Sequence, residues 1–149
     1  MYSNDLVCNI LIYINNNYKK DISIDEISNY FSYNRFYIMK LFKREIDDSI
    51  INYINKLKIY KSIQLLDSNK SILNISISSG FNSLEYYSEI FKKYIGISPN
   101  KYKNLYNLEN KDIVINNVNK IRMFFQEVNN YLCRQKPKIL PVYKRGIFK

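Results

Sequence analysis

The feature that most constrains the fold is a helical pattern that occurs twice along the chain. In each copy a serine precedes a short stretch with helical apolar spacing, a break follows, and a second helical stretch contains Phe-Lys and one more basic residue. The tripeptide Phe-Lys-Arg at 42–44 corresponds to Phe-Lys-Lys at 91–93. Such self-similarity indicates a repeated supersecondary unit, and only 3 Gly and 3 Pro interrupt the 149 residues. We therefore predict an all-α fold built from two helix pairs.

The first copy, residues 22–46, has the pattern of a helix-turn-helix. Ser23, with Glu26 three residues later, forms a capping box that predicts a short helix from residue 24. A polar break at 32–34 leads to a second helix over 35–46. This arrangement is typical of DNA-binding units whose second helix enters the major groove, although other helical hairpins share it. The side chains on or beside the outer face of that helix are Arg35, Phe36, Met39, Lys40 and Lys43.

The second copy, residues 71–96, repeats the arrangement. Gly80 predicts its turn, and either Asn82 or Ser83 begins its second helix. Between the copies, residues 49–68 have the apolar content of one helix of about 18 residues, or roughly 27 Å at 1.5 Å per residue. One turn of DNA is about 34 Å long. We therefore expect this linker helix to hold two reading helices about one turn apart.

The charge and the reactive residues argue for a binding protein. The formal net charge is +10, which favours a polyanionic partner such as nucleic acid, with solubility alone as the alternative. There is no histidine, so the usual general base is missing. Glu85 and Glu89 share a helix face without an accompanying nucleophile or phosphate loop, and Cys8 and Cys133 have no metal-like spacing. We predict no enzymatic activity, no cofactor and no metal.

The N-terminal residues do not have the pattern of a secretory signal, because no basic stretch precedes the first apolar run. That run, at 9–14, is far too short to span a bilayer. We expect a cytoplasmic protein without a membrane partner, in which the two cysteines are packed rather than paired.

Residues 5–106 resemble the DNA-binding domain of the AraC/XylS family of transcription regulators. The resemblance rests on "ISIDEIS", "FYIMKLFKREI", "YINKLKIYKSIQLL" and, most specifically, "ILNISISSGFNSLEYYSEIFKKYIGISPNKYK". It implies a two-lobed, seven-helix fold that binds duplex DNA through consecutive major grooves on one face. It also implies transcription regulation, usually activation, with RNA polymerase as a possible partner.

The resemblance also implies which side chains meet DNA. On the first reading helix, the side chains expected to contact bases are Arg35, Phe36, Met39 and Lys40, with Lys43 beside them. The second offers Leu84, Glu85, Ser88 and Glu89, with Ser83 at its start. Phosphate contacts, partly through backbone N–H groups at helix starts, are expected at Asn34, Ser71, Asn82 and Lys101.

The sequence departs from the family pattern at three kinds of position. Glu89 stands where members often have Arg, and a carboxylate accepts from cytosine but repels phosphate. Asp47 replaces the usual Gly after the first reading helix, which predicts altered turn geometry. Ser28, Ser62 and Ser76 replace small Ala positions and fit if their hydroxyls bond back to the helix backbone.

Residues 107–149 lie outside the resemblance and form the second predicted region, after a DNA-binding domain at 1–106. Residues 112–132 have the spacing of an amphipathic helix, with Ile113 or Val114 on its apolar side. This helix either docks on its own domain or forms a homodimer or partner contact.

The basic tail, residues 133–149, contains six basic residues and no acidic one. It is an arm drawn to phosphate, a solvated tail or the first strand of a larger domain. The rival to a DNA-binding regulator is an interaction or dimerisation module of the same fold that has lost specific DNA reading.

Overall fold

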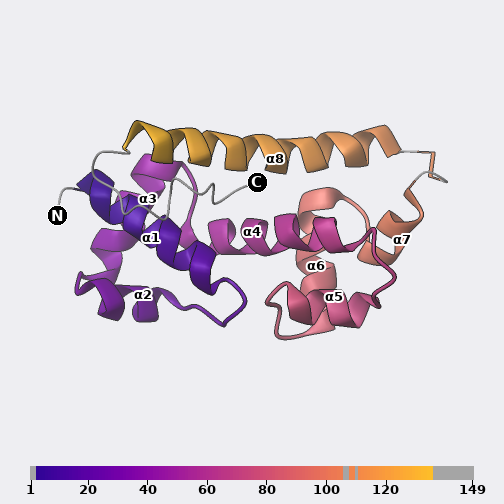
Figure 1. Cartoon of the computed structure of the whole chain (residues 1–149), viewed down its shortest axis with the longest axis horizontal. Helices are drawn as coiled ribbons and strands as arrows, with labels where there is room; N and C mark the ends of the chain where they lie inside the picture. The colour runs from indigo at the N-terminus through magenta and orange to yellow at the C-terminus, as the bar shows by residue number, and fades with distance from the viewer. Residues whose placement is uncertain (1–2, 106–107, 110, 136–149) are drawn as a thin grey trace. The chain divides into compact units, whose positions relative to one another are not determined.

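The computed structural model describes residues 3–105, 108–109 and 111–135, and this part of the chain contains helices and no strand (Figure 1). The helices are α1 (Ser3–Asn17), α2 (Ile24–Phe31), α3 (Arg35–Ile46), α4 (Ile50–Leu65), α5 (Ile72–Ser78), α6 (Leu84–Ile95), α7 (Pro99–Lys103) and α8 (Lys111–Arg134). The predicted all-α fold, with helix pairs α2–α3 and α5–α6 and a further C-terminal helix, is confirmed.

Contacts divide the chain into two compact units. Unit 1 comprises the described parts of residues 1–18, 22–54 and 124–149, and unit 2 comprises those of 19–21 and 55–123. The division falls within α4 and within α8, so each of these helices contributes residues to both units. Each unit contains one complete helix-turn-helix pair.

Unit 1 has α1, α2 and α3 at its core. α1 is buried on most sides, including Leu6, Ile10 and Ile14, because an apolar helix of this kind is stable only when other helices cover it. The ring of Tyr53 in α4 lies 5.5 Å from that of Phe42 in α3 and 5.7 Å from that of Phe125 in α8, both edge to face. These aromatic contacts join α3, α4 and α8 within the unit.

Unit 2 is organised around a chain of aromatic side chains. The ring of Tyr87 lies 4.9 Å from Phe81 and 5.7 Å from Phe91, and Phe91 lies 5.6 Å from Tyr102 of α7. Phe81, Tyr87 and Phe91 are buried and form part of the core of unit 2. Gly80, at φ 92°, makes the predicted turn between α5 and α6.

The helix starts at Ser23, Ser83 and Ser98 are capped by side chains. Ser23 Oγ accepts from the Glu26 N–H at 3.0 Å, which is one of the two hydrogen bonds of a capping box. Ser83, rather than Asn82, caps α6 by accepting from the Tyr86 N–H at 3.1 Å. Ser98 caps α7, with Pro99 in its first turn.

The end of α3 corrects one prediction. Asp47 adopts φ 61° and its N–H bonds to the Lys43 carbonyl, just as Gly96, at φ 99°, bonds to Lys92 after α6. Both helices therefore end in a left-handed cap, and the altered turn predicted at Asp47 is wrong. Aspartate tolerates this conformation better than most residues because its short polar side chain bonds locally.

The start of α4 agrees with the prediction, and its end lies earlier than expected. Ser49 Oγ accepts from the Asn52 N–H at 3.1 Å and caps the helix. The helix ends at Leu65 instead of 68, because the Ser68 N–H bonds to the Leu65 carbonyl and closes a turn. The role of α4 as a spacer between reading helices stays a prediction.

Two of the three serines at family Ala positions behave as predicted. The hydroxyls of Ser62 and Ser76 are buried and donate to the carbonyls of Ile59 and Leu73, at 2.8 and 2.7 Å. Ser28 instead donates to the Tyr33 carbonyl, in the turn between α2 and α3. Its hydroxyl therefore ties down the turn rather than its own helix.

The apolar side of α8 is buried within the chain. Val114 and Ile121 are buried in unit 2, and Phe125, Val128 and Leu132 in unit 1. Of the two alternatives at the start, Val114 faces inward and Ile113 is 62% exposed. Most of the basic tail, residues 136–149, lies outside the described residues.

Candidate nucleic-acid interface

Four exposed side chains of α3 form a single stripe. Phe36, Met39, Lys40 and Lys43, here called the α3 stripe, follow the i, i+3, i+4, i+7 spacing of one helix face. Phe36 is 69% exposed and Met39 38%, and both lysines are exposed. The opposite face, which includes Ile38, is buried. The structure thus brings together four of the five residues predicted for the first reading helix.

An open apolar groove of about 430 Å³ lies along the α3 stripe. Its other walls are Ile24 at the start of α2 and Ile50 and Ile51 at the start of α4. This surface, the α3 groove, lies entirely within unit 1. Ile51 is 44% exposed and lines the groove. Its place there was not predicted from the sequence, because the apolar residues of α4 were all expected to pack against other helices.

Arg35 lies beside the stripe and is engaged with α2. Its Nη1 is 3.2 Å from Asp25 Oδ1, and its Cζ is 5.5 Å from the centroid of the Phe36 ring. Both charged side chains are largely exposed, at 46% and 67%. A pair this exposed contributes at most about 1 kcal/mol, so it directs the guanidinium without locking it there.

The corresponding face of α6 has acidic side chains at its centre. Glu85 and Glu89 are exposed one turn apart, while Leu84 and Ser88 are half-buried. Lys92 extends this face by a further turn and is exposed. Lys92 was not among the predicted site residues, although it occupies the position of the second repeat that is equivalent to Lys43 in the first. We call Glu85, Ser88, Glu89 and Lys92 the α6 stripe.

The predicted phosphate positions fall into two groups. Asn34 Oδ1 accepts from the Phe36 N–H at 2.8 Å and Ser71 Oγ from the Asn74 N–H at 3.1 Å, so both side chains cap helices. A phosphate there would meet the remaining N–H groups of the first turn. Asn82 and Lys101 are exposed, and their side chains can reach a phosphate directly.

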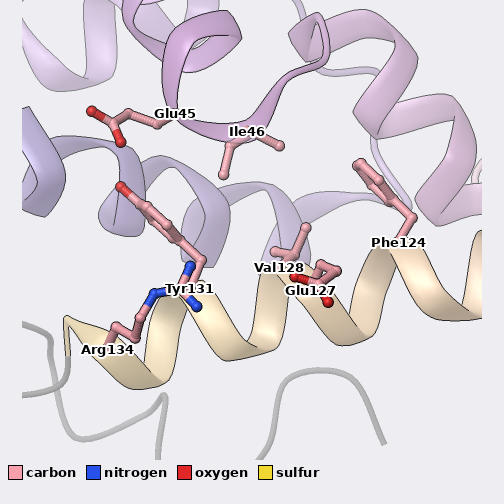
Figure 2. A pocket seen from close by; sticks show the side chains of 7 residues that line it. All are labelled: Glu45, Ile46, Phe124, Glu127, Val128, Tyr131 and Arg134. Carbon is pink, nitrogen blue, oxygen red and sulfur yellow. The ribbon is translucent and has the colours of Figure 1, made fainter.

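A second, smaller hollow of about 180 Å³ lies between α3 and α8 in unit 1 (Figure 2). Its lining includes Glu45, Glu127 and Arg134, and Figure 2 shows the Tyr131 hydroxyl directed toward Glu45. Burial, with the nearby Cys8 and Glu45, raises the pKa of Tyr131. Two carboxylates in this hollow disfavour a polyanion, so the α3 groove is the better candidate for a nucleic-acid contact.

Known sequences and structures identify the family. A sequence profile described as "Helix-turn-helix domain" matches residues 27–104, more than half of the chain. The chain belongs to the AraC/XylS family. The melibiose operon regulatory protein of Escherichia coli K12 is 33% identical to this AraC-type chain over 100 residues. That match covers 66% of the chain and only 33% of the melibiose protein.

Solved structures share the fold. The DNA-binding domain of AdpA, in complex with a target DNA, aligns with a TM-score of 0.64 at 15% identity, over 67% of this chain and 91% of that one. An AraC-type transcriptional regulator from Chromobacterium violaceum aligns with a TM-score of 0.57 at 24% identity, over 66% of this chain and 89% of that one. At these identities the likeness concerns the fold alone.

Metal binding and membrane insertion find no support in the described residues. Among them, no three or more metal-binding side chains gather in one place. Across the same ranges, every helix is too short or too polar to cross a membrane. The family points to DNA binding rather than to an enzyme.

Proposed function

We propose that this AraC-type chain is a sequence-specific, double-stranded DNA-binding transcription regulator. The observation that carries the proposal is the α3 stripe, an exposed helix face with two lysines in a helix-turn-helix whose opposite face is buried. The net charge of +10 supports the same partner. AdpA, whose DNA-binding domain was solved in complex with a target DNA, shares the fold.

In this proposal α3 and α6 are the two reading helices, and they enter consecutive major grooves. The presence of one complete helix pair in each unit supports this assignment. The stripes differ in chemistry, since α3 presents apolar and basic side chains and α6 presents two carboxylates. We therefore expect α3 to supply most of the affinity, and α6 to contribute selectivity through acceptors for cytosine.

The deciding experiment is selection of binding sites from a pool of random duplex DNA at near-physiological salt. Two enriched sequence blocks about ten base pairs apart would support two working reading helices. A single short block would limit base reading to one helix. Binding without any enriched sequence, lost as salt rises, would reduce the interaction to phosphate attraction and refute the proposal.

The second candidate is an interaction module that keeps the fold without reading DNA. Glu85 and Glu89 favour it, because carboxylates at the centre of the α6 stripe repel phosphate. A homodimer through residues 112–132 is one form of this candidate. The burial of Val114, Ile121 and Phe125 within the chain opposes it, and light scattering on a sizing column should therefore give the mass of a monomer.

The remaining parts of the proposal follow from the regulator function. Residues 1–106 carry DNA binding, and residues 107–149 support them or contact a partner. RNA polymerase is the expected protein partner, and the cytoplasm is the expected location because the DNA is there. Since the chain matches only a third of the melibiose regulator, any activity of a longer protein stays outside this assignment.

A further inference from the structure

The α3 groove combines exposure and apolar character in an unusual way for a surface that reads DNA. Phe36, Met39 and Ile51 are 69%, 38% and 44% exposed and line the same groove. Large apolar side chains gathered in one exposed place usually mark a binding surface. The groove is therefore a candidate binding surface for a partner with an apolar part.

The charges around the groove favour DNA over a second copy of the chain as the partner. Lys40 and Lys43 line the groove together with the apolar side chains. A second copy would bring its own lysines to the same surface, and like charges would oppose the contact. Phosphate groups on both sides of a major groove complement these lysines.

Only one apolar group is available in the major groove of DNA. Thymine carries a C5-methyl group there, while guanine, cytosine and adenine present hydrogen-bonding groups. Phe36 and Met39 have no side-chain group that reads those donors and acceptors strongly. Arg35, the side chain best suited to guanine, is directed toward Asp25, beside the stripe rather than at its centre.

We propose that the α3 groove recognises thymine through its methyl group, with Phe36 and Met39 as the specificity-determining residues. The inference rests on the proposed function, because it requires α3 to enter the major groove. Lys40 and Lys43 hold the backbone or an adjacent purine, and the two apolar side chains distinguish thymine from the other bases. The half-site read by unit 1 is therefore expected to contain thymine at one or two invariant positions.

The test uses the full chain and a duplex chosen by selection from random DNA. Each thymine of the selected site is replaced in turn by deoxyuridine, which pairs identically and lacks only the methyl group. At one or two positions in one half-site, affinity measured by fluorescence anisotropy should fall about fourfold, as expected for losing burial of one methyl-sized group. Replacement elsewhere should leave the affinity unchanged.

Variants connect this effect to the groove. In Phe36→Ala, or in Met39→Ala, the difference between thymine and deoxyuridine should disappear at those positions, although binding itself remains. Met123→Ala is the matched control, since Met123 is 63% exposed on α8, outside the groove. That variant should keep the full fourfold discrimination.

The outcomes separate this inference from the function on which it rests. If a site is selected but no deoxyuridine replacement weakens binding, thymine recognition is refuted and DNA reading stands. The same conclusion follows if the discrimination persists in both Phe36→Ala and Met39→Ala. If no site is selected at all, the regulator function fails and this inference fails with it.

Discussion

In the described part of the chain, two residues other than glycine adopt the left-handed backbone conformation: Ser32 at φ 59° and Asp47 at φ 61°. Ser32 ends α2, and its N–H bonds to the Ser28 carbonyl. Left-handed geometry strains most L-residues by about 1–2 kcal/mol, because Cβ approaches a carbonyl oxygen. The tight turn of the first helix pair therefore stores strain at Ser32.

Replacing Ser32 with glycine should relieve this strain. Glycine adopts positive φ freely but loses more entropy on folding, so Ser32→Gly should stabilise the protein by about 0.5–1 kcal/mol. Urea unfolding followed by circular dichroism measures the change. Ser32→Ala is the control, because it keeps the strain and removes the hydroxyl. Equal destabilisation by both variants would show that the backbone conformation does not limit stability.

Lys40 tests the α3 stripe at the same scale. Its side chain is exposed on α3, the proposed reading helix, so Lys40→Ala should weaken binding to the selected site by about 1 kcal/mol or more. Fluorescence anisotropy gives the affinity. Lys120→Ala, which removes an exposed lysine from α8, controls for the loss of one positive charge. Unchanged affinity in Lys40→Ala would remove this residue from the interface.

Among the elements, α6 is the one whose charge opposes its proposed role. Glu89→Arg replaces a repulsive carboxylate with a cation that pairs with phosphate. The affinity for nonspecific duplex DNA should rise, and the slope of log affinity against log salt should steepen by about 1 for each phosphate gained. Glu127→Arg on α8 is the charge-matched control. If both variants change the slope equally, Glu89 does not face DNA.

The docking of α8 should be essential to unit 1. Phe125 is buried and its ring lies 5.7 Å from Tyr53, so Phe125→Ala should destabilise the protein by about 3–5 kcal/mol. Met123→Ala changes a nearby, exposed position of the same helix and should have little effect. Chemical denaturation distinguishes the two. A small loss in Phe125→Ala would mean that α8 is not part of the folded core.

Elements were predictable from the sequence wherever local chemistry determines them. Serine caps and the glycines at 80 and 96 marked helix boundaries, and apolar spacing identified the buried face of α3. The left-handed conformation of Asp47 was not predicted, because the absence of glycine at this position indicated a different turn. The pairing of Arg35 with Asp25, and the groove formed with Ile51, depend on how α2, α3 and α4 meet, which spacing along one helix does not report.

For the whole molecule, the groups with shifted pKa values give an alkaline limit to stability. Burial, with Asp5 and Glu45 nearby, raises the pKa of Cys8 to about 12, and burial raises the pKa of Tyr87 to about 12 as well. A raised pKa stabilises the fold below the ordinary value of the group. That contribution declines as pH rises from the ordinary to the raised value.

We therefore expect stability to fall progressively between about pH 9 and pH 12, the range spanned by the ordinary and raised pKa values of these groups. Burial lowers the pKa values of Lys58 and Lys61, and these two groups act in the opposite direction. Urea unfolding midpoints across this range measure the sum. Cys8→Ala should make the decline shallower, whereas an unchanged slope in that variant would exclude the buried thiol as a cause.

One hydrogen bond affects how this molecule can be divided. The Asn117 amide donates to the Ile95 carbonyl at the end of α6, yet Asn117 lies beyond residues 27–104, the stretch that matches the family profile. A fragment cut at that boundary would keep every side chain of the α6 stripe and the Gly96 cap, and it would lose the additional bond from Asn117 to the last turn. The α6 stripe and one side chain that supports its helix therefore lie in different parts of the sequence. In a chimaera that contains only residues 27–104, the C-terminal turn of α6 would therefore be closed by its backbone cap alone.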